Sequence, residues 1–547
     1  MNQKKSTAIH LLAGIVCAAL VLSLGACGKR EKNKETCEGT FRVAVMDTME
    51  SLNPLTAEGN PANDVFLLCY DPLWRLDANY EPVGCLAESW DLSTDKLTWT
   101  VRLRQGVYFS DEAHTELTSA DVKFSYELME KHSEKYADYL DGITSIVCPD
   151  DYTVVFTTEY VKGDMLYNSI PILPKAYWSS YAENPESFEN ADLIGTGPFI
   201  YDALQSEKDA IALHANTDYF GGSPHVETIV FQTMKNASVA ANALSTGEVD
   251  ACLGLTDAQM MTLSSIGSVE LIQSQTPAGG CCVLGFNTQR GGLDDENVRK
   301  AIEYCVNRDK IFAMVFGASG VSGSVFFAPG NNYYQPSVEI REYNKEQAVM
   351  LLESHGYSDY DGDGIRESLD GQVELSFTLY TSVEDEWAPT VVTILSGDLE
   401  EIGISVSWVA LEEGKDIYSS CKPGGNWGLY ISQAETWNNP VITAGSFYSS
   451  AKHTTGWSDE DYDALYLQMC CQLDENEAVA LARELQVKVY DACPWVVLAY
   501  PVSFQAIRSD LWTGYSECMT ASGGLFATGT YETYMNVRLN EENESVG

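Results

Sequence analysis

Residues 85–129 constrain the fold of this chain more than any other stretch. Hydrophobic and polar residues alternate over residues 97–104, which is the period of a half-buried β-strand. The polar residues 93–96 suit a hairpin turn that joins this strand to the one before it. Thr118 stands three residues before Asp121, the spacing of a capping box, so a helix is predicted to begin there.

The same stretch resembles the signature of the family 5 solute-binding proteins of ABC importers, which include oligopeptide-, dipeptide- and nickel-binding proteins. The family pattern is close to W-x-x-S-x-D-x-x-x-(W/Y)-T-(F/V)-x-L-R-x-G-V-x-F, then a D-G turn and L-T-A-x-D-V. One departure is that residues 111–116 replace the short D-G turn and contain no glycine. The positions that fit are Trp90, Ser93, Asp95, Trp99, Leu103, Arg104, Gly106, Val107, Phe109, Leu117, Thr118, Asp121 and Val122.

Other motifs of this family follow in the expected order. Residues 193–199 match G-T-G-P-(F/Y), and their two glycines predict a sharp bend at a hinge or crossover between domains. Residues 281–287 are predicted to form a strand that ends in the family's F-N-T motif, and residues 295–316 to form a helix. Arg299 in this helix is either a ligand residue or a structural one that bridges the helix to a loop.

The resemblance covers nearly all of residues 41–540. It implies an α/β fold of the periplasmic-binding-protein type II, in which two hinged lobes close on a ligand. It also implies an extra domain inserted in the first lobe. The expected boundaries are residues 40–75, 192–280 and 505–545 for the first lobe, 76–191 for the extra domain and 281–504 for the second lobe.

The N-terminal segment has the features of a targeting signal. Two lysines precede an apolar run at residues 9–24, which is short for a membrane span of about 20 apolar residues. The run leads into Leu-Gly-Ala-Cys, which resembles the lipobox of bacterial lipoproteins, where Cys27 is diacylated. Residues 1–27 are therefore predicted to be a lipoprotein signal peptide and residues 28–39 a disordered tether, with a simple transmembrane anchor as the alternative.

The net charge bears on the partners of this chain, and the cysteine count bears on its disulfides. A formal net charge of −46 repels nucleic acid, so none is expected as a partner. Of the 15 cysteines, Cys17 and Cys27 lie in the predicted signal, and the 13 that remain are an odd number. At least one is therefore unpaired, and because no C-x-x-C spacing occurs, buried free thiols are expected.

The sequence DYDGDGIRESLD at residues 359–370 resembles a calcium-binding loop. Oxygen ligands at this spacing can wrap one cation, although position 12 is Asp where the loop pattern has Glu. No cofactor is expected to be required, and a purely structural turn is the alternative. The candidate ligands are Asp359, Asp361, Asp363, the Ile365 carbonyl, Glu367 and Asp370.

The resemblance also implies a ligand site between the two lobes. In peptide-binding relatives, an Asp four residues before a Pro pairs with the peptide's amino group. Counted back from Pro440, that position is Thr436, whose neutral hydroxyl cannot replace a buried carboxylate, whereas Glu435 stands beside it. Phe124 and Trp437 are predicted to be apolar walls, with core packing as the alternative. The predicted ligand residues are Thr48, Met49, Glu50, Phe124, Gln433, Glu435, Thr436 and Trp437.

The resemblance implies a monomeric, lipid-anchored binding protein that captures a solute, foremost a peptide, outside the cytoplasm and delivers it to an ABC permease. A carrier of a nickel chelate, haem or another small solute is an alternative, as is a ligand sensor without transport. A secreted hydrolase is a further alternative of a different class. Against it, the sequence holds no G-x-S-x-G, H-E-x-x-H or P-loop motif.

Overall fold

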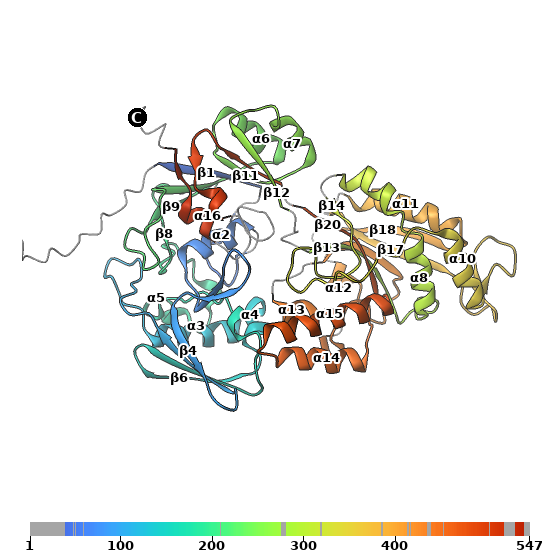
Figure 1. The fold of residues 1–547 in the computed structure, drawn as a ribbon, viewed down its shortest axis with the longest axis horizontal. Helices are drawn as coiled ribbons and strands as arrows, with labels where there is room; N and C mark the ends of the chain where they lie inside the picture. Colours follow the sequence, from blue (N-terminus) through green and yellow to red (C-terminus); the bar gives the residue numbers. More distant parts are fainter. Residues whose placement is uncertain are drawn as a thin grey trace, which may run out of the picture.

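The computed structural model shows two α/β lobes side by side, with a smaller four-stranded unit attached to the first (Figure 1). Among the described residues, no helix combines the length and apolarity that a membrane crossing needs. The predicted signal and the lipobox Cys27 lie outside the described residues. These are residues 39–46, 49, 51–57, 60–207, 209–274, 280–317, 320–383, 385, 387–412, 415, 417–434, 439–451, 453–502, 504–518 and 531–540.

The first lobe is built on a seven-stranded sheet in the order β12-β21-β11-β1-β10-β9-β8. Strand β1 runs parallel to both of its neighbours, β10 and β11. Its side chains alternate, so that Phe41, Val43 and Val45 enter one core while Ala44 enters another beneath α6. The strands are β1 Thr40–Val45, β8 Phe199–Tyr201, β9 Ala210–Ala215, β10 Thr228–Thr233, β11 Ala251–Leu255, β12 Val269–Gln273 and β21 Phe504–Arg508, and the helices α2 Asn60–Cys69, α6 Ala237–Thr246, α7 Asp257–Leu263 and α16 Glu532–Asn536.

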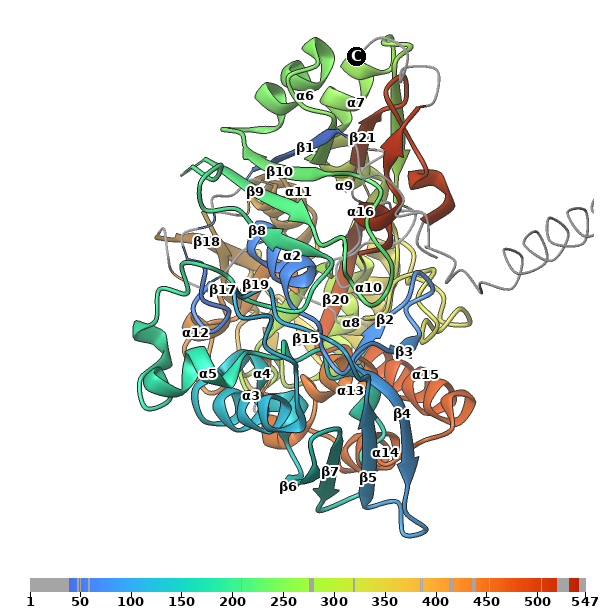
Figure 2. The same cartoon turned by 90° about the vertical axis from the view of Figure 1, so that its left-hand side faces the viewer.

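The four-stranded unit contains most of residues 85–129, the stretch with the family signature (Figure 2). The predicted hairpin is β4 with β5, and the predicted helix is α3. The Thr118 amide donates to Asp121 Oδ2 at 2.9 Å, and the capping box is present. Phe156 of this unit shares one core with Phe41 of the first lobe, so the two pack as a single body. The elements are β4 Ala87–Leu92, β5 Thr98–Leu103, β6 Ile143–Asp150, β7 Thr153–Thr158, α3 Ser119–His132, α4 Glu134–Leu140 and α5 Lys175–Trp178.

The second lobe is built on a six-stranded sheet in the order β14-β20-β13-β19-β17-β18. One core lies under α8, α10 and α11, and the other under α13, α14 and α15. The strands are β13 Cys281–Phe286, β14 Gly320–Val321, β17 Ser376–Ser382, β18 Ser405–Leu411, β19 Leu429–Ala434 and β20 Trp495–Pro501. The helices are α8 Glu296–Tyr304, α10 Lys345–Ser354, α11 Ala388–Glu400, α12 Ile417–Ser420, α13 Pro440–Gly445, α14 Glu460–Cys470 and α15 Glu475–Ala492.

One sequence prediction about local structure is wrong, and another needs a different physical reason. The single helix predicted over residues 295–316 is broken after Tyr304, because Asn307 caps a new helix through the Lys310 amide. The bend predicted at the G-T-G-P motif is present at residues 196–198, although neither of its glycines has a positive φ. A Cβ on Gly195 would lie 2.0 Å from the Cys69 carbonyl oxygen, so these glycines serve close packing against the end of α2.

Candidate ligand-binding site

The chain passes between the two lobes twice, and these passages show which edges of the sheets face each other. The first runs from β12, which ends at Gln273, to β13, which begins at Cys281. The second runs from β20, which ends at Pro501, to β21, which begins at Phe504. Because both passages are short, the strand ends that they join lie at the facing edges of the two sheets.

The carboxyl ends of the parallel strands lie at these facing edges. In the first lobe, Leu255 at the end of β11 pairs with Phe504, so β1 and β10, which run parallel to β11, end at the same edge. In the second lobe, Ala434 at the end of β19 pairs with Cys281. Strands β17 and β18 run parallel to β19 and end beside it. Open α/β sheets bind ligands beyond the carboxyl ends of their strands, so this is the candidate site.

The structure describes three of the eight predicted ligand residues. Met49 follows β1 and packs against the core of the first lobe. Phe124 on α3 packs against the same core and is partly exposed. Gln433 is exposed on β19, and its carbonyl accepts a hydrogen bond from the Tyr418 hydroxyl at 2.9 Å. The other five lie outside the described residues: Thr48, Glu50, Glu435, Thr436 and Trp437.

The structure adds a carboxylate that the sequence motifs do not indicate. Asp385 follows β17 at the same sheet edge, and the Ser432 hydroxyl of β19 donates to its Oδ2 at 3.3 Å. Burial raises the pKa of the Cys282 thiol, and Cys281 and Asp385 add to that rise. The only sequence signal for Asp385 is that it is an acidic residue just after a strand. The family pattern points only to the strand that precedes Pro440.

Arg299 serves the fold, which was the structural alternative. It is 4% exposed, and its guanidinium donates to main-chain carbonyls. Nε donates to Cys493 at 2.9 Å, and Nη1 donates to Leu293 at 2.7 Å. These bonds tie α8 to the turn before it and to the segment before β20.

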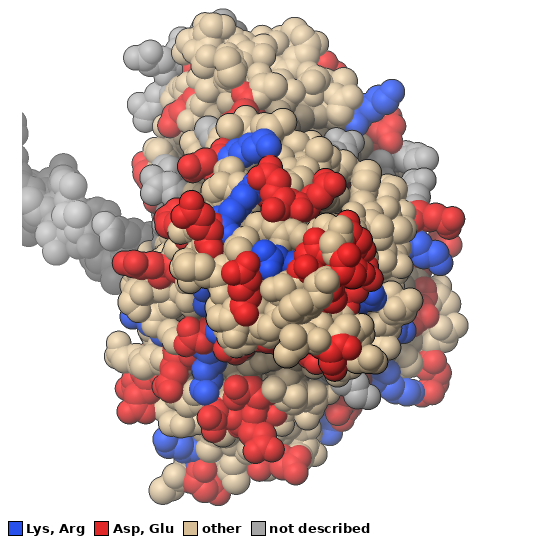
Figure 3. Space-filling model, turned by 90° about the vertical axis from the view of Figure 1, so that its right-hand side faces the viewer, with Lys and Arg blue, Asp and Glu red and all other residues tan. Residues whose placement is uncertain are grey.

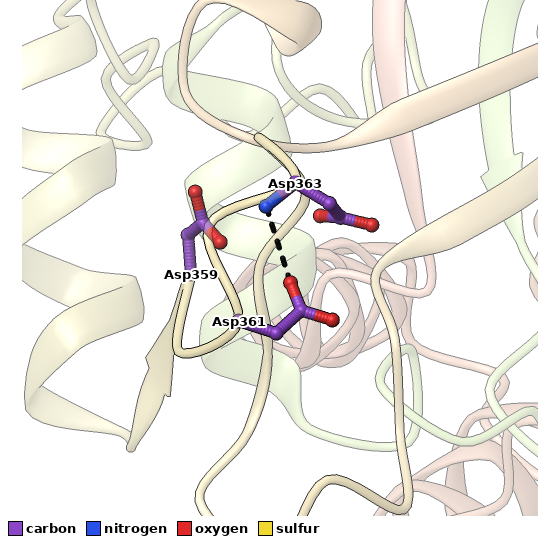
Figure 4. Close-up of side chains that lie close together, drawn as sticks. All are labelled: Asp359, Asp361 and Asp363. Carbon is purple, nitrogen blue, oxygen red and sulfur yellow. Dashed lines mark hydrogen bonds between the residues drawn. The ribbon is translucent and has the colours of Figure 1, made fainter.

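Three of the predicted calcium ligands gather in the second lobe (Figure 4). Asp359, Asp361 and Asp363 place carboxylate oxygens within 4.8 Å of one another, and all three are exposed. The face of the molecule shown in Figure 3 carries many acidic side chains. Both oxygens of Asp359 accept amide hydrogens, from Gly362 at 2.7 Å and from Gly364 at 3.0 Å. The loop is therefore also organised by its own backbone.

The other two carboxylates among the predicted calcium ligands have local partners. Glu367 Oε1 accepts from the Tyr360 amide at 2.6 Å. Asp370 Oδ1 accepts from the Ser368 hydroxyl at 2.7 Å, and this bond lowers the pKa of Asp370. The Ile365 amide donates to Asp363 at 2.8 Å. Calcium binding by this loop stays a prediction.

The cysteines agree with the expectation of buried free thiols. None of the twelve cysteines in the described residues lies in a disulfide, and most are buried. Burial raises the pKa of Cys281 and Cys305 to about 12, which keeps these thiols protonated and poorly reactive at neutral pH.

A family model described as bacterial extracellular solute-binding proteins, family 5 Middle, matches residues 81–459. Oligopeptide-binding protein AppA of Bacillus subtilis (strain 168) is 23% identical over 535 residues, which cover 93% of this chain and 96% of AppA. The dipeptide-binding protein of Escherichia coli (strain K12) is 26% identical over 471 residues, which cover 79% of this chain and 83% of that protein.

Solved structures agree on the fold. AppA from Bacillus subtilis in complex with a nonapeptide aligns with a TM-score of 0.73 and 21% identity, over 93% of this chain and 100% of AppA. NikZ from Campylobacter jejuni in complex with Ni(L-His) aligns with a TM-score of 0.74 and 21% identity, over 91% of this chain and 99% of NikZ. The predicted fold class and the predicted family are confirmed. The chain belongs to family 5 of the bacterial extracellular solute-binding proteins.

Proposed function

We propose that this protein captures a peptide outside the cytoplasm and delivers it to the permease of an ABC importer. The observation that carries the proposal is that two lobes of a family 5 protein present the carboxyl ends of parallel strands to each other. Relatives support the choice of ligand, since AppA has been solved with a nonapeptide and another relative is a dipeptide-binding protein.

An extended peptide suits a site between sheet edges. Its main-chain amides and carbonyls find partners at the strand ends, and its side chains enter pockets on either side. Closure of the lobes excludes water, which strengthens each polar contact with the ligand. Met49 and Phe124 belong to the first lobe's wall in this proposal, and Gln433 and Trp437 to the second lobe's wall.

The peptide's ammonium group needs a carboxylate partner in such a site, because a buried charge is costly unless it is paired. Thr436, at the family's Asp position, offers only a hydroxyl. Glu435 and Asp385 follow neighbouring strands and are the carboxylates that we propose for this role. Asp385 is supported by its bond from Ser432, which orients the carboxylate at the sheet edge.

A thermal-shift screen tests the proposal. A peptide digest should raise the melting temperature, and the same digest with acetylated amino groups should raise it less; at 100 times Kd a ligand adds about 2.7 kcal/mol. Asp385→Asn should reduce the shift, whereas Asp209→Asn, at an exposed turn of the first lobe, should not. Stabilisation by nickel–histidine or haemin, with none by peptides, would overturn the peptide assignment.

We also propose that Cys27 is acylated and holds the protein on the outer face of the cell membrane. The support is the lipobox-like ending of the apolar run. One acyl chain binds a membrane only weakly, so a stable anchor requires at least two chains on this residue. Cys27→Ala should release the protein into the medium, whereas Cys17→Ala should not. Retention of the Cys27→Ala protein on membranes would contradict the anchor.

A further inference from the structure

The two lobes also meet at a place far from the chain passages. The loop that follows β7 in the four-stranded unit, residues 159–167, docks on the second lobe where α14 leads to α15. The Gly163 amide donates to the Cys470 carbonyl at 2.7 Å. Leu473 of the second lobe packs against the core of the first. In Figure 1, α13 and α14 lie beside the four-stranded unit at the bottom, whereas β12 and β20 approach each other near the top.

A buried ion pair stands at the centre of this contact. Lys162 Nζ lies 3.0 Å from Asp164 Oδ1, and each side chain is 3% exposed. The second lobe reaches the pair through Asn439, whose Nδ2 donates to Asp164 Oδ2 at 3.2 Å. Beside it, the hydroxyls of Tyr167 and Tyr333 lie 2.9 Å apart, one from each lobe. Polar contacts therefore join the two lobes at three points: Gly163 with Cys470, Asp164 with Asn439, and Tyr167 with Tyr333.

Gly163 allows the close approach at this contact. A Cβ there would lie 2.2 Å from the Gln472 carbonyl oxygen and 2.9 Å from that of Cys470, both in the second lobe. Gly163 does not have a positive φ, so its own backbone could accept a side chain. The requirement for glycine comes from docking, not from the conformation of the loop.

The contact is not packed like a core. A cavity of about 170 Å³ lies within it, lined by both lobes. Its lining includes Leu166, Tyr167, Tyr333, Val441, Gln472 and Glu475. Polar, incompletely packed surfaces within a chain are typical of domains that move relative to each other.

We propose that residues 159–167 form a latch that holds the two lobes closed without ligand. Because the passages tie the lobes together at one end, rotation about them separates the latch surfaces. Opening would hydrate Lys162 and Asp164, and water would replace the bond from Asn439. The latch is thus reversible, and it sets the population of the closed form that a ligand meets.

Small-angle X-ray scattering of the unliganded protein tests the latch through two matched glycine variants. Gly163→Val places a side chain against the second lobe and should increase the radius of gyration. Gly267→Val is the control, because a Cβ on Gly267 would meet no atom within 4 Å and this residue has no positive φ. The control should keep the radius of gyration of the wild type.

A second pair of variants tests the polar contact itself. Asn439→Asp keeps the oxygen that caps α13 through the Val441 amide at 2.9 Å, but it sets a carboxylate against Asp164. Loss of a hydrogen bond to a charged group should shift the closure equilibrium about tenfold toward the open form. Adding Asp164→Asn to this variant restores a donor and an acceptor across the contact and should restore closure.

The outcomes separate clearly. The latch is supported if Gly163→Val and Asn439→Asp expand the unliganded protein and the double variant returns to the wild-type radius. Equal radii for Gly163→Val, Asn439→Asp and wild type would overturn it. Circular dichroism spectra identical to wild type would exclude unfolding as the cause.

Discussion

Within the described residues, the buried charges around Glu303 and around Asp164 differ in where they lie. Glu303 is 3% exposed in the second lobe and pairs with Arg341 at 2.5 Å and with Arg308 at 3.5 Å. Asp164 is equally buried and pairs with Lys162. The Glu303 cluster is enclosed by one lobe, because Arg308 also donates to the Val497 carbonyl of β20 at 3.0 Å. The Asp164 cluster is buried only where two lobes touch.

This difference decides what each cluster can control. Removing one partner from a buried ion pair is costly when the remaining charge stays buried. In the Glu303 cluster the remaining charges stay largely buried as long as the second lobe is folded. In the Asp164 cluster the remaining charge reaches water when the lobes part. Substitutions in the Glu303 cluster should therefore change the free energy of unfolding. Substitutions in the Asp164 cluster should change the equilibrium between open and closed lobes.

The largest effect should come from Glu303→Ala. Two guanidinium groups would lose their carboxylate inside a folded lobe, so the free energy of unfolding should fall by about 3–5 kcal/mol. Urea denaturation measures it. Glu296→Ala is the control, since its pair with Lys300 is half-exposed and such pairs contribute about 0.5 kcal/mol or less. A loss below about 1 kcal/mol in Glu303→Ala would mean that the lobe rehydrates the cluster without unfolding.

The second lobe should also be the acid-sensitive one. His453 stacks on Phe447 with ring centroids 4.4 Å apart, and burial lowers the pKa of His453 to about 4. The unfolded chain binds this proton near pH 6.5, so the stabilisation is present above that pH and is lost as pH falls toward 4. The loss should be on the order of 2–3 kcal/mol. In His453→Asn, the stability obtained from melting curves should fall less steeply between about pH 7 and pH 4 than in the wild type. An equally steep fall in both proteins would contradict the assignment.

Asp164→Ala should have a small effect on folding in spite of the burial of its carboxylate. Because opening of the lobes lets water reach Lys162, the free energy of unfolding should change by less than about 1 kcal/mol. Urea denaturation alongside Glu303→Ala gives the comparison directly. A loss as large as that of Glu303→Ala would show that the two clusters are equivalent.

The smallest effect concerns the exposed carboxylates at residues 359–370 in the second lobe. If they bind calcium as weakly as extracellular modules do, calcium at a concentration equal to Kd should add about 0.4 kcal/mol of stability. Asp361→Asn should lose this gain, whereas Asp209→Asn should keep it. Calorimetry without heat of binding at millimolar calcium would remove the metal and leave a structural turn.

Local interactions explain which parts of the fold could be predicted from the sequence. The capping box of Thr118 and Asp121 involves residues three apart, and the alternation over residues 97–104 reports one strand's two faces. The close packing of Gly195 could not be predicted, because its neighbour, Cys69, lies far away in the sequence. A glycine motif indicates that another group packs closely against the backbone, but it does not indicate which atoms these are.

The site was only partly predictable for the same reason. Family motifs led to the loops after β1 and β19, but Asp385 became a candidate only when the sheet order put β17 next to β19. The latch had no sequence signal, since Gly163 lies in a short irregular loop and Asn439 and Cys470 are distant in the chain. Such contacts follow from the docking of two lobes, which no local pattern encodes.

Native mass spectrometry of the purified protein shows directly whether it binds a peptide. After incubation with a peptide digest, each chain should carry the added mass of one peptide. Denaturation should release these peptides, and their sequencing should show free amino termini. A chain that keeps its unliganded mass in the digest, or that carries a metal chelate or haem in place of a peptide, would contradict the account.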